Sequence, residues 1–196
     1  MQVSDGAAVA LLMTRGEAQR RGLPVVGVWR SFSVVGVDPA IMGVGPAVAI
    51  PEAVRRAGLT LDDIDVFEIN EAFASQALYC VNELGIPAEK VRGLTRMRSP
   101  GLRCVVRGRG AVCVQVNPNG GAIALGHALG CTGARMTATL LHEMKRRGRG
   151  ARFGVVSMCI GSGMGAAAVY EVGDYGDATS HTQPTQGVGF LSRDAM

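Results

Sequence analysis

The chain has 196 residues, enough for one domain with a buried core and too few for two of ordinary size. Hydrophobic residues make up 47%, but no apolar run approaches the roughly 18 residues of a membrane span, which excludes a transmembrane protein. The start, Met-Gln-Val-Ser-Asp-Gly, lacks the basic and apolar regions of a signal peptide. Five scattered cysteines without a Cys-x-x-Cys pair favour reduced thiols over disulfides or a zinc site.

The net charge of +4 comes from one segment. Residues 91–115 contain six arginines and no acidic residue, and the rest of the chain is slightly acidic. The segment has no aromatic residue that could stack on a base. We therefore expect a solvated or disordered loop rather than a nucleic-acid-binding surface.

Apolar patterns and breaks predict alternating strands and helices in the first half of the chain. The expected elements are an apolar run at 7–13, a helix-like stretch at 17–21, a valine-rich strand at 24–37, a helix from Pro46 to about Gly58, a capped turn at 60–63, a strand at 66–69 and a helix at 71–84.

In the second half, residues 131–147 predict a helix with one apolar face, formed by Met136, Leu140, Leu141 and Met144. Two apolar runs, 153–160 and 166–172, are joined by a glycine turn, which is typical of a hairpin. From 173 to 196 the polar composition predicts a disordered tail. The alternation as a whole predicts an α/β fold, a mixed sheet layered with helices.

Two polar residues framed by glycines stand out. His127 lies in Gly120-Gly-Ala-Ile-Ala-Leu-Gly-His-Ala-Leu-Gly130, and Cys159 begins Cys159-Ile-Gly-Ser-Gly-Met-Gly165. Glycine lets the backbone approach a ligand, and its N–H groups can hold an oxyanion while an imidazole and a thiol move protons. We therefore expect acyl-transfer chemistry, with the pKa of Cys159 lowered by the following amides and the imidazole. A structural histidine and an inert buried cysteine are the alternatives.

Asn70 directly precedes the helix expected at 71–84. The favoured interpretation is an N-cap, whose side-chain oxygen accepts a free backbone N–H. The alternative is an amide that holds a water or a substrate oxygen near His127. The glycines after Cys159 do not form Gly-x-Gly-x-x-Gly and no Gly-Lys-Ser/Thr occurs, so a dinucleotide fold and a P-loop are excluded.

Three motifs, in this order, resemble the C-terminal half of the thiolase family. They are Ile69-Asn-Glu-Ala-Phe73, Asn117-x-x-Gly-Gly-Ala-Ile-Ala-Leu-Gly-His127 and Cys159-Ile-Gly-Ser-Gly-Met-Gly165, and Val3-Ser-Asp-Gly-Ala-Ala8 and Ile41-Met-Gly-Val-Gly-Pro46 extend the match. Cys131-Thr-Gly-Ala-Arg135 is most similar to the peroxisomal 3-ketoacyl-CoA thiolase branch. The resemblance implies a thiolase-like C-terminal domain over 1–172, with an arginine-rich insertion at 91–115.

This resemblance implies an acetyl-CoA C-acyltransferase of fatty-acid β-oxidation, which cleaves 3-ketoacyl-CoA to acetyl-CoA and a shortened acyl-CoA. His127 would activate a nucleophilic thiol, Asn70 would position a water in the oxyanion site, Cys159 would shuttle a proton at the acetyl carbon, and the N–H of Gly161 would serve a second oxyanion site. The resemblance also implies coenzyme A as co-substrate, no permanently bound cofactor or metal, a homodimer and a peroxisomal location. The last residues, Asp-Ala-Met, are no peroxisomal address.

The sequence departs from the family pattern in several places. None of its five cysteines matches the nucleophile, which belongs to the N-terminal half, Met1 stands where a serine of the CoA-binding loop is usual, and Ala128 replaces the usual proline. The chain alone is therefore expected to be inactive. The alternative function is a non-catalytic truncated or mis-spliced isoform that pairs with full-length thiolase subunits or aggregates through an exposed apolar face.

The arginine-rich segment interrupts the family pattern. Joining Lys90 to Val116 gives the continuous Glu-Lys-Val-Asn-Pro-Asn-Gly-Gly, and GTGAGG for Val91-Arg92 and CAG for Gln115 fit splice donor and acceptor ends. We hypothesise that 91–115 is a translated retained intron, and we expect it to disturb both Asn70 and the His127 loop.

Transcript sequencing checks this hypothesis. Transcripts that lack the codons for 91–115 are expected, because splicing would remove them. Finding these codons inside an ordinary exon of related thiolases would refute the idea.

Overall fold

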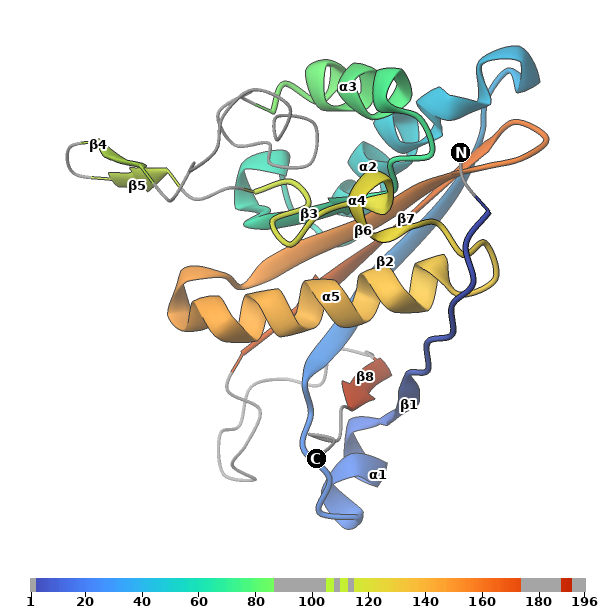
Figure 1. The fold of residues 1–196 in the computed structure, drawn as a ribbon. Coiled ribbons are helices and arrows are strands. Elements are labelled where there is room, and N and C mark those ends of the chain that lie inside the picture. The colour runs from blue at the N-terminus through green and yellow to red at the C-terminus, as the bar shows by residue number, and fades with distance from the viewer. Residues whose placement is uncertain (1–2, 87–104, 108–109, 113–114, 174–187, 192–196) are drawn as a thin grey trace.

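The fold is built on a six-stranded mixed sheet. The structure of the chain is a computed structural model that describes residues 3–86, 105–107, 110–112, 115–173 and 188–191 (Figure 1). The strands follow the order β1-β8-β2-β7-β6-β3, with bounds Leu11–Thr14 (β1), Val188–Leu191 (β8), Gly27–Gly36 (β2), Met164–Glu171 (β7), Phe153–Ile160 (β6) and Val66–Ile69 (β3). β6 pairs antiparallel with β7 and parallel with β3, which confirms the mixed sheet and the predicted hairpin.

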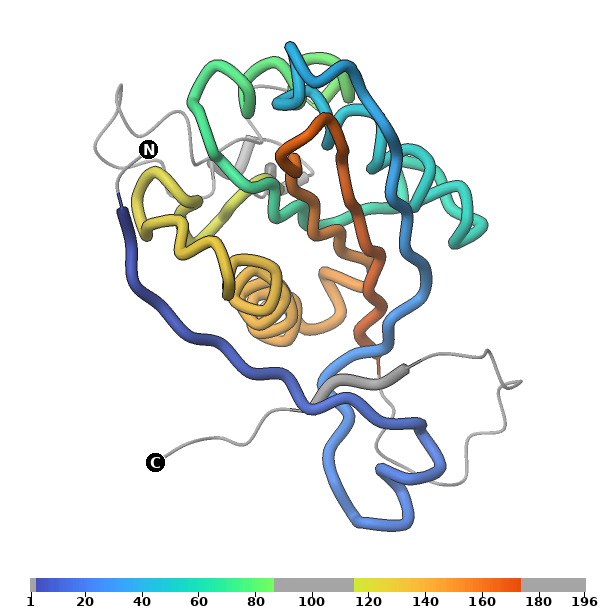
Figure 2. Tube along the Cα trace, turned by 90° about the vertical axis from the view of Figure 1, so that its right-hand side faces the viewer, coloured from blue at the N-terminus to red at the C-terminus, as the bar shows by residue number. Residues whose placement is uncertain are grey.

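Helices cover both faces of this sheet. The helices are α1 (Arg15–Arg20), α2 (Gly45–Arg56), α3 (Ala74–Glu83), α4 (Ala122–Leu125) and α5 (Thr132–Arg147), with 3-10 turns at Pro39–Val44, Leu61–Asp63 and Gly148–Gly150. Seen end-on in Figure 2, α5 lies on one side of β6 and β7, and α2 and α3 lie on the other. In the described parts of the chain, no helix is long and apolar enough to cross a bilayer.

Each face carries its own apolar core. Phe67 and Ile69 on β3 pack with the helices α2 and α3, whereas Val66, on the opposite face of the strand, packs with α5, as the two-residue period of a strand requires. The predicted face of α5 is confirmed, since Met136, Leu140, Leu141 and Met144 are all buried against the sheet. Burying a side chain of this size stabilises a fold by about 1.5–3 kcal/mol.

The start of α3 differs from the sequence prediction. The helix begins at Ala74 rather than at residue 71, and Phe73 before it is extended, with φ −141° and ψ 143°. Asn70 continues the hydrogen bonding of β3 to β6, because its backbone N–H donates to the carbonyl of Ser157 on β6 (2.9 Å). The prediction that Asn70 is the N-cap of this helix is therefore wrong, since the helix starts four residues later.

Two segments expected to be irregular contain strands. Val105–Arg107 (β4) and Gly110–Val112 (β5) pair in a separate two-stranded sheet, and β8 pairs with both β1 and β2. These residues depart from the loop predicted at 91–115 and the disordered tail predicted from 173. The remaining residues of both segments lie outside the described ranges.

The chain returns to the main sheet at the last residue of the arginine-rich segment, Gln115. The N–H of Phe67 donates to the carbonyl of Gln115 (2.7 Å), and the N–H of Asn117 donates to the carbonyl of Phe67 (2.8 Å). Residues 115–117 therefore dock along the free edge of β3. Asn70 and His127 lie within 3.3 Å of each other in the chain that carries this segment.

Two glycines let α2 lie directly on the strand β7. A Cβ at Gly165 would lie 2.2 Å from the carbonyl oxygen of Gly45, and a Cβ at Gly45 would lie 2.6 Å from the carbonyl oxygen of Met164. Both obstacles are backbone atoms, which cannot move aside as a flexible side chain can.

Gly165→Ala is expected to lower the free energy of unfolding by about 1–3 kcal/mol, because the added methyl group forces α2 away from the sheet. The matched control is Gly36→Ala on β2, where a Cβ meets nothing within 4 Å. Urea unfolding of both variants measures the difference. Equal midpoints for the two variants would contradict the close packing.

Candidate active site

The structure brings His127 and Asn70 together. Asn70 follows β3 and His127 lies in the loop between α4 and α5, and Asn70 Nδ2 lies 3.3 Å from His127 Nε2. Asn70 is 1% exposed. The contact places the amide near His127, as the alternative interpretation of Asn70 requires. That this amide holds a water or a substrate oxygen stays a prediction.

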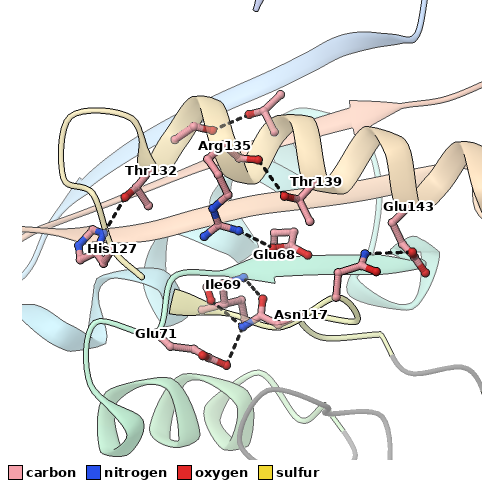
Figure 3. Close-up of polar contacts among 12 residues, drawn as sticks. Glu68, Ile69, Glu71, Asn117, His127, Thr132, Arg135, Thr139 and Glu143 are labelled. Carbon is pink, nitrogen blue, oxygen red and sulfur yellow. Dashed lines mark hydrogen bonds and ion pairs between the residues drawn. The ribbon is translucent and has the colours of Figure 1, made fainter. Parts of the chain in front are cut away.

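Hydrogen bonds around Thr132 assign the tautomer of the imidazole. The hydroxyl of Thr132 donates to the carbonyl of Ala128 (2.8 Å) and lies 2.7 Å from His127 Nδ1 (Figure 3). Since the hydroxyl has a single proton, it accepts from Nδ1–H. Nε2 is then unprotonated and accepts from the amide of Asn70.

The surroundings of His127 favour its neutral form. Burial lowers the pKa of His127 below its ordinary value, and the positive charge of Arg135 on α5 lowers this pKa further. The imidazole is therefore uncharged near neutral pH, and the unprotonated Nε2 carries a lone pair that accepts from the amide of Asn70. A group in this state can act as a general base.

A buried ion pair lies beneath the imidazole loop. Arg135 Nη1 lies 3.5 Å from Glu68 Oε2, and Glu68 is 1% exposed on β3 (Figure 3). Burial raises the pKa of Glu68 to about 8, although the charge of Arg135 acts in the opposite direction. Glu68 Oε1 and Asn70 Oδ1 are the two buried side-chain oxygens in the described chain without a hydrogen bond.

Sequence reasoning missed the residues that hold the His127 loop. The side chain of Asn117 bonds the backbone of Ile69, and Glu71 accepts the backbone N–H of Ile123 (3.2 Å). The backbone N–H of His127 donates to Ser4 Oγ (3.3 Å). Asn117 and Glu71 belong to the motifs quoted above, since Glu71 directly follows Asn70 and Asn117 begins the motif that ends at His127. This position in the motifs is the sequence signal that could have identified them.

Cys159 lies on the hairpin, near the end of β6, opposite Gly165. The side chain of Cys159 lies on the same face of the sheet as that of Val155, which packs with α2 and α3. The side chain of Asn70 lies on the opposite face, with that of Glu68, which contacts Arg135 on α5. In the described chain no hydrogen bond joins Cys159 to His127. β3 and β6 are nevertheless parallel, with Ile69 opposite Ser157, so Asn70 and Cys159 lie at the same end of the two strands.

The expectation of a lowered pKa for Cys159 is wrong. Burial raises the pKa of this thiol, and only a backbone hydrogen bond opposes the effect. The physical reason is that loss of water penalises the thiolate, and no cation or imidazole contact offsets the loss. The thiol is therefore held in its protonated form.

The remaining candidates occupy exposed positions. Gly161 is the first residue after β6 and is exposed, and a Cβ there would meet nothing within 4 Å. His142, on α5, is also exposed. Across the residues that the structure describes, no group of three or more His, Cys, Asp or Glu side chains is placed to hold a metal ion.

Known proteins similar to this chain are thiolases. Peroxisomal 3-ketoacyl-CoA thiolase 2 of Arabidopsis thaliana is 58% identical over 194 residues, which cover 99% of this chain and 37% of that protein. This chain therefore spans little more than a third of the length of that relative.

Solved thiolase structures share the fold. Two are of the peroxisomal enzyme of Saccharomyces cerevisiae, both 50% identical. One is described as five-layered and built from two core domains of identical topology (TM-score 0.62, 80% of this chain, 37% of that chain), and the other as dimeric (TM-score 0.64, 81% and 33%). Human mitochondrial 3-ketoacyl-CoA thiolase in complex with CoA is 36% identical (TM-score 0.65, 81% and 33%).

The domain family described as "Thiolase, C-terminal domain" matches residues 23–172, which include β2, β3, the His127 loop and the Cys159 hairpin. With the same fold and the same motifs, this chain belongs to the thiolase family and carries its C-terminal domain.

Proposed function

We propose that this chain is the C-terminal part of a 3-ketoacyl-CoA thiolase and supplies its acid/base and oxyanion groups. The reaction is the thiolytic cleavage of 3-ketoacyl-CoA to acetyl-CoA and a shortened acyl-CoA, in fatty-acid β-oxidation. The observation that carries the proposal is the placement of the His127 imidazole, whose Nδ1 lies 2.7 Å from the Thr132 hydroxyl and whose Nε2 lies 3.3 Å from the amide of Asn70.

His127 is the base for a nucleophilic cysteine of the N-terminal half. Its Nε2 takes the thiol proton, and the thiolate attacks the 3-keto carbon of the substrate. The bond between C2 and C3 then breaks, which leaves the acyl group on the cysteine and a carbanion on the acetyl unit. Asn70, beside Nε2, positions a water in the oxyanion site.

Cys159 is the proton donor to the carbanion. Its raised pKa supports this role, since a thiol that stays protonated at rest has a proton to give. The exposed N–H of Gly161 serves the second oxyanion site. Coenzyme A then takes the acyl group from the cysteine: its thiol gives its proton to the Cys159 thiolate, and the released cysteine takes back the proton held by His127. CoA and acyl-CoA are therefore the small-molecule partners, and no permanently bound cofactor is involved.

The proposed setting follows from the relatives. They are named peroxisomal, which supports the peroxisome as the location, and the yeast structure described as dimeric supports a homodimer of the whole enzyme.

A reconstitution experiment tests the proposed reaction. The purified chain alone is expected to leave acetoacetyl-CoA and CoA unchanged. Co-expression with the N-terminal half of a peroxisomal relative is expected to restore cleavage, because that half brings the nucleophile. The activity should fall as the pH drops through the lowered pKa of His127, since an imidazolium cannot take the thiol proton.

The variant His127→Ala is expected to lower kcat of the reconstituted pair by about 10²–10⁴ fold. His142→Ala, on the exposed side of α5, is the matched control and should retain full activity. Cleavage by the 196-residue chain alone, or full activity of His127→Ala, would contradict the proposed roles.

A non-catalytic interaction protein is the second candidate function, and one surface favours it. On one face of the sheet, helix α5 covers β3 and β6 (Figure 1). An apolar groove of about 240 Å³ runs beside α5 on this face. Trp29, Phe32, Met158 and Tyr170 line this groove, and Phe32 is 45% exposed. In the yeast structure two core domains of identical topology assemble into five layers, so a core domain of a thiolase subunit is the proposed occupant.

Size-exclusion chromatography with and without full-length thiolase tests this second function. We expect the chain to elute with the thiolase, and Phe32→Glu to weaken co-elution by placing a charge in the groove. Val48→Glu is the control, since Val48 is similarly exposed (46%) and lies on α2, which packs on the opposite face of the sheet. A stable, monodisperse monomer that does not co-elute with the thiolase would exclude the interaction.

A further inference from the structure

We propose that Asn117 and Glu71 are positioning residues that hold Asn70 against His127, and that residue 121 is glycine because Glu71 occupies the space of its side chain. The inference rests on the proposed function, in which Asn70 and His127 act as a pair. It assigns a role to two buried polar side chains that the proposed chemistry does not use.

Asn117 brackets Asn70 from both sides. Its Oδ1 accepts the N–H of Ile69 (2.9 Å), and its Nδ2 donates both to the carbonyl of Ile69 (2.9 Å) and to Glu71 Oε1 (3.0 Å). A single side chain therefore fixes the residue before Asn70 and the residue after it (Figure 3).

The backbone of Asn117 is arranged for this task. Its φ is +45°, in the left-handed region where asparagine is better tolerated than most residues. At this point the chain turns away from the edge of β3, and the side-chain amide replaces the backbone as the partner of Ile69. The amide of Asn117 carries both a donor and an acceptor, so it can bond the N–H and the carbonyl of one residue at once.

Glu71 connects this bracket to the histidine loop. Its Oε2 accepts the backbone N–H of Ile123, four residues before His127. A Cβ at Gly121 would lie 2.2 Å from the carboxyl carbon of Glu71, so any other residue at 121 would push this carboxylate out. Glu71 is 3% exposed and Asn117 is 1% exposed, which means that water cannot replace the lost partners.

The arrangement explains how the side chains of Asn70 and His127 are kept in contact. They are 57 residues apart and lie on different elements. Thr132 and Ser4 fix the imidazole and the backbone of His127. The contacts through Asn117 and Glu71 link the end of β3 to the start of the His127 loop.

Glu71→Gln in the 196-residue chain is the first test. Both neighbours of the carboxylate, Asn117 Nδ2 and the N–H of Ile123, are donors, so the new NH₂ group must face one of them. We expect the amide of Asn70 to leave Nε2 while the Thr132 bond persists. The ¹⁵N chemical shift of Nε2 should move toward that of a free imine nitrogen, and the pKa of His127 should rise by roughly half a unit or more, because the neutral form loses a hydrogen bond.

The double variant Glu71→Gln, Asn117→Asp is the rescue. The carboxylate introduced at position 117 can accept from the new amide and from the N–H of Ile69, and the side-chain carbonyl introduced at position 71 can accept from Ile123. Donors and acceptors are matched again at residue 71, whereas the carbonyl of Ile69 loses its donor from position 117, so the Nε2 shift and the pKa should return part of the way to the original values. Asn119→Asp is the matched control for Asn117→Asp, since Asn119 is exposed and bonds Glu143 and Arg146.

Long-range ¹H–¹⁵N correlation spectra across a pH titration provide these readouts, and circular dichroism reports folding. A folded Glu71→Gln variant whose His127 titrates as in the original chain overturns the proposal. A folded double variant that lies no nearer the original chain than the single variant also overturns it. None of these readouts involves thiolysis, so they remain decisive whether or not the reconstituted pair is active.

Discussion

The parallel pairing of β3 with β6 is the constraint on which the site depends. Ile69 lies opposite Ser157, so both strands end at the same edge of the sheet and deliver Asn70 and Cys159 there. The N–H of Asn70 bonds the carbonyl of Ser157, which keeps Asn70 in the sheet and delays α3 until Ala74. A shift of this register by one residue would turn the side chain of Asn70 away from α5 and His127.

Burial has opposite effects on the pKa values of His127 and Cys159, the two groups proposed to transfer protons. It lowers the pKa of His127 and raises that of Cys159, so that both groups rest in their uncharged forms. The same loss of water therefore prepares one group to accept a proton and the other to give one. Arg135 strengthens the effect at His127, and the largely buried Glu68 is its partner.

The sheet is unevenly covered. On one face α2 and α3 pack over an apolar core, whereas on the other α5 leaves β2 and part of β7 open as an apolar groove. The floor of the groove is made of small residues, Ala166 and Ala168, and its outer wall of Trp29 and Phe32. A layer that leaves such a surface is suited to packing against another layer of the same kind, as in the two-domain yeast enzyme.

Much of the fold followed from local pattern. The apolar stripe of α5, the strand pair around the glycine turn and the strand Val66–Ile69 were predicted because their periodicity and bounding glycines are local properties. The strands at Val105–Arg107, Gly110–Val112 and Val188–Leu191 were not, since strand pairing depends on partners distant in the sequence. The start of α3 was also missed, because the bond from Asn70 to Ser157 overrides the local preference for a cap.

The sequence by itself predicted which residues carry the chemistry: the motifs contain His127, Asn70, Cys159 and Gly161, and they identify the family. Only the tertiary structure decided how these residues meet. It placed the amide of Asn70 on the imidazole, set the tautomer through Thr132, and reversed the expected direction of the pKa of Cys159. The reason is that hydrogen-bond partners and exposure to water depend on segments that are distant in the chain and become neighbours only when the sheet forms.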